Sequence, residues 1–310
     1  MGRPIAVIDI GTNSTRLLIA EVEDGRVREV ERRSVVTRLG EGVDSAGRLA
    51  EKAMERVYKV LEEYRELIER HGAEPIVAVA TSAVRDSENG DEFQAALRER
   101  FGIELRVLTG DEEARLTFLG ATAGRDPGTT TLVIDIGGGS TEFVIGHAGG
   151  EPDFHVSTQA GSVRQTERHL HHDPPTSEEL DELRREVREI VDEAVPRDLR
   201  AAVELGIAVA GTATQLASID LELDPPGSAD VDGYRLTRDA CERILDLVAS
   251  KPLEERREVR GLDPDRAPTI VAGAAILLEA LDAFELGAVE VAQADILHGA
   301  ALASRHTQTG

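Results

Sequence analysis

A short turn sequence occurs twice in this chain. The stretch IDIGTNST at residues 8–15 returns, with small changes, as IDIGGGST at residues 134–141. Each copy lies between two runs of apolar residues, which predicts a turn joining two buried strands. The simplest chain with such a repeat has two similar halves. The residues of the first copy and its following strand that recur unchanged are Ile8, Asp9, Ile10, Gly11, Ser14, Thr15 and Ile19.

The length of the chain also favours two domains. A single hydrophobic core usually stops growing at about 250–300 residues, and this chain has 310. Gly, Pro and Thr cluster in GRDPGTTT at residues 124–131, where the pattern begins again. We therefore predict a first domain at residues 1–125 and a second at 126–310, with the last helix packing back on the first domain.

Strand and helix patterns alternate in both halves, which predicts α/β domains. The strand segments are rich in Ile, Val and Leu, as expected when helices cover both faces of a sheet. One amphipathic segment, residues 46–72, is predicted to end with Gly72 as the C-cap residue of its helix. Another begins with Thr176 and Glu179 at the spacing of a capping box.

Composition excludes several classes of protein. No apolar run approaches the roughly 18 residues of a membrane span, and the net charge of −24 argues against a nucleic-acid partner. The strand pattern begins soon after Met1, which leaves no room for a secretion signal, so we expect a cytoplasmic protein. The single cysteine, Cys241, is predicted to be a buried apolar residue.

The repeated turns have the composition of phosphate-binding loops. Gly, Thr, Asn and Ser between two strands present consecutive backbone N–H groups and hydroxyls to an anion, and glycine lets a ligand approach the backbone closely. A third candidate is AGTAT at residues 210–214. The predicted phosphate-binding residues are Gly11, Thr12, Asn13, Ser14, Arg16, Gly137, Gly138, Gly139, Ser140, Thr141, Gly211, Thr212 and Ala213.

An aspartate precedes each repeated turn. Asp9 and Asp135 would be repelled by a neighbouring phosphate unless a divalent cation lay between them, so both are predicted metal ligands. The alternative is that aspartate serves only the chemistry of the turn. Arg16 and Glu142 occupy matching positions in the two copies, which offers a cation to phosphate in one half and an acid to metal or water in the other.

Six segments, taken in order, closely resemble the exopolyphosphatase and guanosine pentaphosphate phosphohydrolase family. They are IDIGTNSTRLLIAEV, ATSAVRDSENG, LTGDEEARLTFLGA, VIDIGGGSTEFVIG, GSVRQTERHL and AGTATQLASI. The resemblance covers nearly the whole chain in the short two-domain form of the family. It implies two ribonuclease-H-like domains of the actin, sugar kinase and heat-shock ATPase superfamily around a central cleft.

The resemblance also implies an activity. It points to a phosphoric anhydride hydrolase that depends on Mg²⁺, with Mn²⁺ as a substitute, and removes terminal phosphates from polyphosphate. Guanosine pentaphosphate is the alternative substrate, and the sequence does not rank the two. A homodimer is expected at the level of the family.

Roles carry over to matching residues. Glu113 in GDEEA matches the family's catalytic glutamate, which orients or deprotonates water, while Glu112 is interpreted as an acid at a helix start. Arg85 and Arg164 match arginines that face the phosphate channel. Glu142 matches an acid that handles metal and water, so the predicted catalytic set is Glu113, Glu142 and Arg85, and the metal set is Asp9, Asp135 and Glu142.

Some segments depart from the family pattern. Where the family often has arginine in a C-terminal LREG-like segment, this chain has ILHG at residues 296–299, so His298 either takes that place or has no role. RAPTI places Pro268 where the family has an acid. HLHHD at residues 169–173 resembles a metal motif, but it lies before a Pro-Pro loop and is not assigned a metal.

Two other functions remain open from the sequence. A small-molecule kinase of the same fold would need an adenosine pocket, for which 310 residues leave little room. A non-catalytic sensor of polyphosphate or guanosine polyphosphates would bind these ligands without releasing phosphate. Retention of Glu113, Asp135 and Glu142 together argues against a sensor.

Overall fold

The computed structural model describes residues 3–23, 25–224 and 231–306, and these fall into two compact units. The first unit runs to Arg125 and resumes at Ala294, and the second spans Asp126 to Gln293. The sequence analysis placed residues after 293 in the second domain, with the last helix packing back. In the structure these C-terminal residues belong to the first unit.

The first unit is built on a five-stranded sheet, counted over the described residues, in the order β3-β2-β1-β4-β5. Strands β1 to β3 are antiparallel, and β1, β4 and β5 are parallel. The strands are β1 (Ile5–Ile10), β2 (Ser14–Glu23), β3 (Arg26–Val36), β4 (Ile76–Ala80) and β5 (Leu105–Val107). The helices are α1 (Val43–Ala46), α2 (Glu51–His71), α3 (Ser82–Arg85), α4 (Gly90–Phe101), α5 (Gly110–Thr122) and α13 (Ile296–His306).

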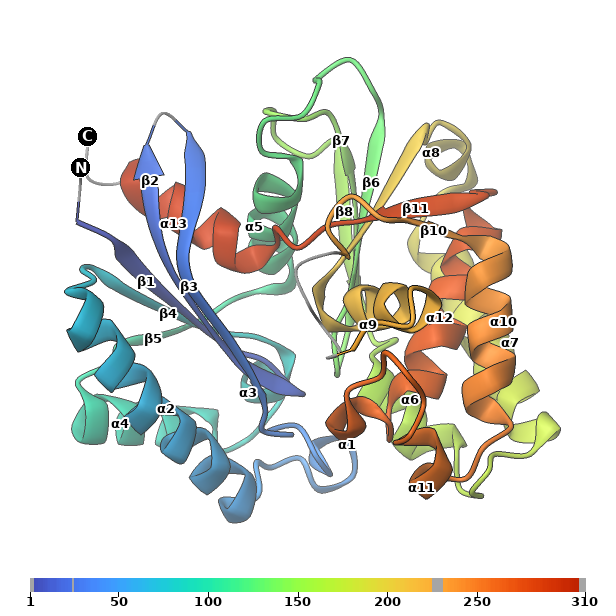
Figure 1. The fold of residues 1–310 in the computed structure, drawn as a ribbon, viewed down its shortest axis with the longest axis horizontal. Coiled ribbons are helices and arrows are strands. Elements are labelled where there is room, and N and C mark those ends of the chain that lie inside the picture. The colour runs from blue at the N-terminus through green and yellow to red at the C-terminus, as the bar shows by residue number, and fades with distance from the viewer. Residues whose placement is uncertain (1–2, 24, 225–230, 307–310) are drawn as a thin grey trace. The chain divides into compact units, whose positions relative to one another are not determined.

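Both faces of this sheet are covered (Figure 1). Ile8 and Leu17 face a core formed with α2 and α4, whereas Val7 and Leu18 pack against Leu297 and its neighbours on α13. Successive residues of a strand point to opposite faces, so a strand covered on both sides is buried along its whole length and is mostly apolar. All six residues of β1 are accordingly buried.

The second unit repeats this plan. Its sheet, again counted over the described residues, has the order β10-β11-β9-β6-β7-β8, so β6 to β9 and β11 match β1 to β5. The strands are β6 (Thr131–Ile136), β7 (Thr141–Gly146), β8 (Phe154–Thr158), β9 (Leu205–Val209), β10 (Arg235–Thr237) and β11 (Ala288–Val291). The helices are α6 (Ser162–His169), α7 (Ser177–Ala194), α8 (Arg197–Ala201), α9 (Ala210–Asp220), α10 (Arg238–Ala249), α11 (Leu253–Arg256), the 3₁₀ helix η2 (Pro264–Arg266) and α12 (Ile270–Ala283).

Local signals in the sequence act as predicted. Gly72 ends α2 in the left-handed region with φ 59°, where glycine has no steric penalty. Thr176 and Glu179 form the capping box of α7. Cys241 is fully buried in the core of the second unit, and burial raises the pKa of its thiol to about 12. Among the described residues, no helix is long and apolar enough to cross a membrane.

Candidate active site

The two repeated turns have the same backbone geometry. In the first, the Gly11 N–H donates to the Ser14 carbonyl at 3.0 Å, and in the second, the Gly137 N–H donates to the Ser140 carbonyl, also at 3.0 Å. A Cβ on Gly11 would lie 3.1 Å from the Ser14 oxygen, so the tight turn favours glycine there. The sequence repeat therefore produces a repeated structure.

Each turn presents a pair of residues across its two strands. Asp9 on β1 lies directly opposite Arg16 on β2, and Asp135 on β6 lies opposite Glu142 on β7. Residues paired in this way project to the same face of a sheet. The matching positions inferred from the sequence for Arg16 and Glu142 are thus confirmed by the strand registers.

The first turn is connected to the predicted catalytic glutamate within its own unit. The hydroxyls of Thr12 and Ser82 are hydrogen-bonded at 2.8 Å, and Ser82 begins helix α3. At the other end of α3, Arg85 Nη1 donates to Glu113 Oε2 at 3.0 Å and to the Leu108 carbonyl, also at 3.0 Å. The four-residue helix α3 thereby links the first repeated turn to a buried acid.

Two neighbouring glutamates at the start of α5 have different environments. Glu112 closes a capping box with Thr109, and its pKa is lowered mainly by the Thr109 N–H and also by Arg106. Glu113 is only 6% exposed and turns toward Arg85. The prediction that Glu112 is a helix-start acid is confirmed. Glu113, in contrast, is buried beside Arg85.

In the second unit the predicted phosphate residues meet around the second turn. The N–H groups of Val163 and Arg164 both donate to the Gly138 carbonyl, and Arg164 Nε donates to the Gly139 carbonyl at 2.9 Å. The Thr212 hydroxyl donates to the Ile136 carbonyl at 3.1 Å, which connects the third candidate segment to the same place. Arg164 thus supports the second turn through its bonds to the Gly138 and Gly139 carbonyls, and its predicted contact with phosphate stays a prediction.

The third segment, AGTAT, forms the first turn of helix α9 rather than a loop before it. Ala210 has φ 63°, a conformation that is uncommon for residues other than glycine. Helix N-termini favour anions because their N–H groups are not used by the helix. The guanidinium of Arg266 lies against Gly211, where an added Cβ would come within 2.0 Å of Nη1. Arg266 was not predicted as a site residue, although it stands in the noted RAPTI segment.

Glu142 is held by a residue that sequence reasoning missed. The Ser157 hydroxyl on β8 donates to Glu142 Oε1 at 2.7 Å, and the two residues are paired across β7 and β8. Glu142 is 1% exposed and Asp135 is 6% exposed. No sequence signal identifies Ser157, because the contact depends on the register of two strands.

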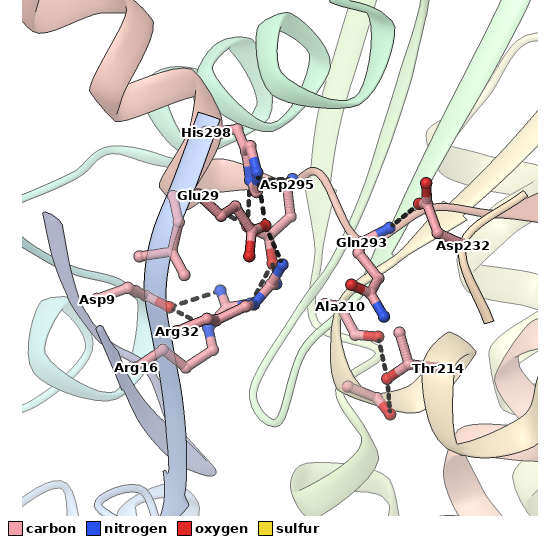
Figure 2. A network of polar contacts seen from close by, with 12 residues as sticks. Asp9, Arg16, Glu29, Arg32, Ala210, Thr214, Asp232, Gln293, Asp295 and His298 are labelled. Carbon is pink, nitrogen blue, oxygen red and sulfur yellow. Dashed lines mark hydrogen bonds and ion pairs between the residues drawn. The ribbon is translucent and has the colours of Figure 1, made fainter. Parts of the chain in front are cut away.

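Arg16 contacts two carboxylates rather than open solvent. Its Nε and Nη2 donate to Asp9 Oδ2 at 2.8 and 2.6 Å, and its Nη1 donates to Asp295 Oδ2 (Figure 2). Burial raises the pKa of Asp9, and the nearby Arg16 offsets this only in part. Asp295 was not predicted, because it lies 279 residues from Arg16 in the chain and meets it only in the folded unit.

The chemistry of Asp9 fits a hard cation. Its Oδ1 is buried and has no hydrogen-bond partner within residues 3–23, 25–224 and 231–306. Over the same residues, no three His, Cys, Asp or Glu side chains form a metal cluster. Mg²⁺ typically uses only one or two carboxylates together with substrate phosphate, so this donor set suits it. In HLHHD, His169 pairs with Glu186 and His172 pairs with Glu179, each at 2.8 Å.

Comparisons with known proteins agree with this geometry. The model of the Ppx/GppA phosphatase family matches residues 18–307. Exopolyphosphatase 2 of Mycobacterium tuberculosis is 36% identical, with 96% of this chain and 97% of that protein aligned.

Two solved structures are similar over 99% of both chains. An exopolyphosphatase-like protein has a TM-score of 0.92 at 34% identity, and the Aquifex aeolicus Ppx/GppA family member has a TM-score of 0.82 at 31% identity. These matches confirm the family inferred from the six segments, the α/β fold and the assignment to an enzyme family. The chain belongs to the Ppx/GppA phosphatase family.

Proposed function

We propose that this chain is an exopolyphosphatase that hydrolyses the terminal phosphate of inorganic polyphosphate. The observation that carries the proposal is the placement of Glu113. Its buried carboxylate accepts a hydrogen bond from Arg85 Nη1 at 3.0 Å, in the same unit as the first repeated turn, which has the composition of a phosphate-binding loop. Relatives named exopolyphosphatase, such as exopolyphosphatase 2 of Mycobacterium tuberculosis, support this choice of substrate.

The first task of the site is to bind a chain of phosphates. The backbone N–H groups and hydroxyls of the two turns would bind phosphate oxygens, as would the N-terminal turn of α9. Arg164 would add positive charge beside the second turn. Phosphoryl transfer depends mainly on such positioning and charge neutralisation, so these residues supply what the reaction requires.

The second task is to activate water. Glu113 accepts a proton as the water oxygen attacks the terminal phosphorus, and the bridging P–O bond to the rest of the polymer breaks. The products are orthophosphate and a polymer that is shorter by one phosphate. Arg85 keeps the Glu113 carboxylate in one orientation, because the same nitrogen is also anchored to the Leu108 carbonyl.

Each unit would offer its own carboxylates to a metal ion, Asp9 in the first unit and Asp135 with Glu142 in the second. Mg²⁺, when bound, would neutralise charge on phosphate oxygens. The open Oδ1 of Asp9 supports this role. Ser157 orients the Glu142 carboxylate by its bond to Oε1.

The test is release of orthophosphate from long-chain polyphosphate and, in parallel, from guanosine pentaphosphate, with and without Mg²⁺. Glu113→Gln should lower the rate by about 10²- to 10⁴-fold, the usual contribution of a general base. Glu112→Gln is the matched control, because glutamine also closes a capping box, and it should retain activity.

Each outcome has a clear meaning. Faster release from polyphosphate than from guanosine pentaphosphate supports the proposed substrate, and the reverse order replaces it with the nucleotide. Tight binding of either ligand without release of phosphate would identify a sensor. Equal rates for wild type and Glu113→Gln would remove Glu113 from the mechanism.

A further inference from the structure

A buried acid outside the predicted site is connected to it. Asp295 precedes α13 and is 0% exposed. Its Oδ2 accepts from Arg16 and also from Arg32 Nη2 at 3.3 Å, while its Oδ1 accepts from the Leu297 N–H at 3.0 Å (Figure 2). His298 lies next to it, with Nδ1 at 3.8 Å from Oδ1. A buried carboxylate with this many partners has a fixed orientation.

The segment that carries Asp295 is fixed in turn by helix α5. An added Cβ on Gly120 would lie 2.0 Å from the Asp295 carbonyl oxygen, and one on Gly299 would lie 1.8 Å from the Leu116 carbonyl oxygen. The two helices therefore approach as closely as their backbones allow, and only glycine fits at the contact. The backbone at Asp295 is consequently fixed, so Asp295 cannot shift together with Arg16 if the Arg16 side chain moves.

Arg16 connects the fixed carboxylate of Asp295 to Asp9 and so sets the orientation of Asp9. A guanidinium is planar and donates in a rigid fork, so bonds made on two of its edges set its orientation. One edge of Arg16 is bound to Asp9 Oδ2 through two nitrogens, and the remaining terminal nitrogen is bound to Asp295. Arg16 is therefore a bridge between the C-terminal segment and the strand that enters the first turn.

The bridge leaves Asp9 asymmetric. Both bonds from Arg16 end on Oδ2, and within the described chain Oδ1 is buried with no hydrogen-bond partner. A rotation of the Arg16 fork would place a donor on Oδ1 and occupy the oxygen that suits a cation. Asp295 prevents that rotation by holding the opposite edge.

Charge acts in the same direction as geometry. Asp9 and Asp295 share the charge of Arg16. Loss of Asp295 would remove one negative charge from the neighbourhood of Asp9 and Arg16. Asp9 would then attract a divalent cation less strongly.

We propose that Asp295 is a positioning residue that, through Arg16, keeps Asp9 Oδ1 open for a divalent cation. This rests on the proposed function in one respect, since Asp9 is there assigned as a metal ligand. Residues that orient metal ligands in this way typically change metal affinity by 10- to 100-fold when they are replaced.

The experiment measures Mn²⁺ affinity by water-proton relaxation, with no substrate present, for wild type, Asp9→Asn and Asp295→Asn. The matched control is Glu279→Gln, because Glu279 is also 0% exposed and paired with two arginines, Arg184 and Arg188, but lies in the second unit. The Mg²⁺ concentration for half-maximal phosphate release and the midpoint of thermal unfolding are measured for the same proteins.

Asp295→Asn should weaken Mn²⁺ binding about tenfold or more and raise the Mg²⁺ requirement in parallel. Glu279→Gln should lower the thermal midpoint and leave Mn²⁺ affinity unchanged. If Asp295→Asn behaves like Glu279→Gln, or if Asp9→Asn binds Mn²⁺ as wild type does, the proposal is wrong.

A second variant keeps the test decisive. If Asp295→Asn does not yield folded protein, Asp295→Glu retains the buried charge but moves the carboxylate along the side chain, and the same two outcomes apply to it. The result is separable from the proposed function. If the wild type releases no phosphate from polyphosphate, the proposed exopolyphosphatase function is wrong. The Mn²⁺ affinity tests the role of Asp295 without any turnover.

Discussion

Arg85 and Glu113 form a part-buried ion pair, with 3.0 Å between Nη1 and Oε2. The side chain of Arg85 is 22% exposed and that of Glu113 is 8% exposed, so water screens the pair little. Arg85 also belongs to the helix that begins next to the first turn. The pair fixes the direction in which the candidate base points.

Replacing Arg85 should therefore impair catalysis more than folding. Arg85→Met keeps much of the side chain's bulk but removes the cation, and we expect kcat to fall about 100-fold because Glu113 loses its orientation. Steady-state kinetics on polyphosphate measure this effect. Arg98→Met is the control, since Arg98 pairs with Glu104 on the surface of the same unit and should not affect turnover. An equal loss in both variants would contradict the assignment.

Ser157 should matter for activity through Glu142. Ser157→Ala removes the 2.7 Å bond to Glu142 Oε1, and hydrogen bonds to charged groups contribute about 1.5–3 kcal/mol. We expect kcat to fall about tenfold or more with little change in the thermal midpoint. Ser45→Ala, which removes an exposed hydroxyl bonded to the Gly42 carbonyl, is the comparison. Unchanged kcat in Ser157→Ala would show that Glu142 needs no such support.

The contact between α5 and α13 should tolerate no side chain. In Gly299→Ala the new Cβ would meet the Leu116 carbonyl oxygen at 1.8 Å, and a backbone atom cannot move aside cheaply. We expect a loss of about 3 kcal/mol in the free energy of unfolding, measured in urea. Gly287→Ala, where nothing lies within 4 Å of the added Cβ, should change it little. A similar midpoint for both variants would refute the close contact.

His298 should make stability depend on pH. Burial alone would lower the pKa of this imidazole, but Asp295 and Glu29 on β3 raise it, with Arg32 opposing them, and the net shift is upward. A raised histidine pKa adds stability that is fully present below the unfolded value of 6.5 and is lost as pH rises through the folded value. Wild type should therefore exceed His298→Gln by more at pH 6 than at pH 9.

Urea unfolding of both proteins at the two pH values measures this difference. His298 Nε2 lies 3.0 Å from Glu29 Oε1, so a doubly protonated ring can donate to that carboxylate while its other nitrogen faces Asp295. A constant gap between wild type and His298→Gln across the range would mean that the ring does not change charge in the folded state.

Much of the fold follows from local patterns. The repeated turns, the Gly72 C-cap and the Thr176 capping box depend on residues near one another, and each is present. Strand β3 is not predicted from the sequence. Its residues, RVREVERRSVV, are mostly exposed, and it forms as the edge strand by pairing along β2. An edge strand rich in charge carries little hydrophobic pattern for a sequence method to detect.

The residues of the candidate site also fall into those that local sequence patterns indicate and those that they do not. The Asp9–Arg16 and Asp135–Glu142 pairs could be inferred because each belongs to one repeated turn. Asp295, Ser157 and Arg266 could not, because each touches its partner only after distant segments have packed. The role of Glu113 as catalyst stays a prediction until the variants described above are measured.

The return of α13 to the first unit has a consequence for how the protein is made. During synthesis the strands β1 and β2 emerge before the second unit, yet Leu297 and Ala301, which cover Val7 and Leu18, emerge only after all of that unit. The amino-terminal unit must therefore wait, with apolar surface uncovered, while the whole second unit is translated. The second unit, residues 126–293, therefore has all of its residues available before the first unit does.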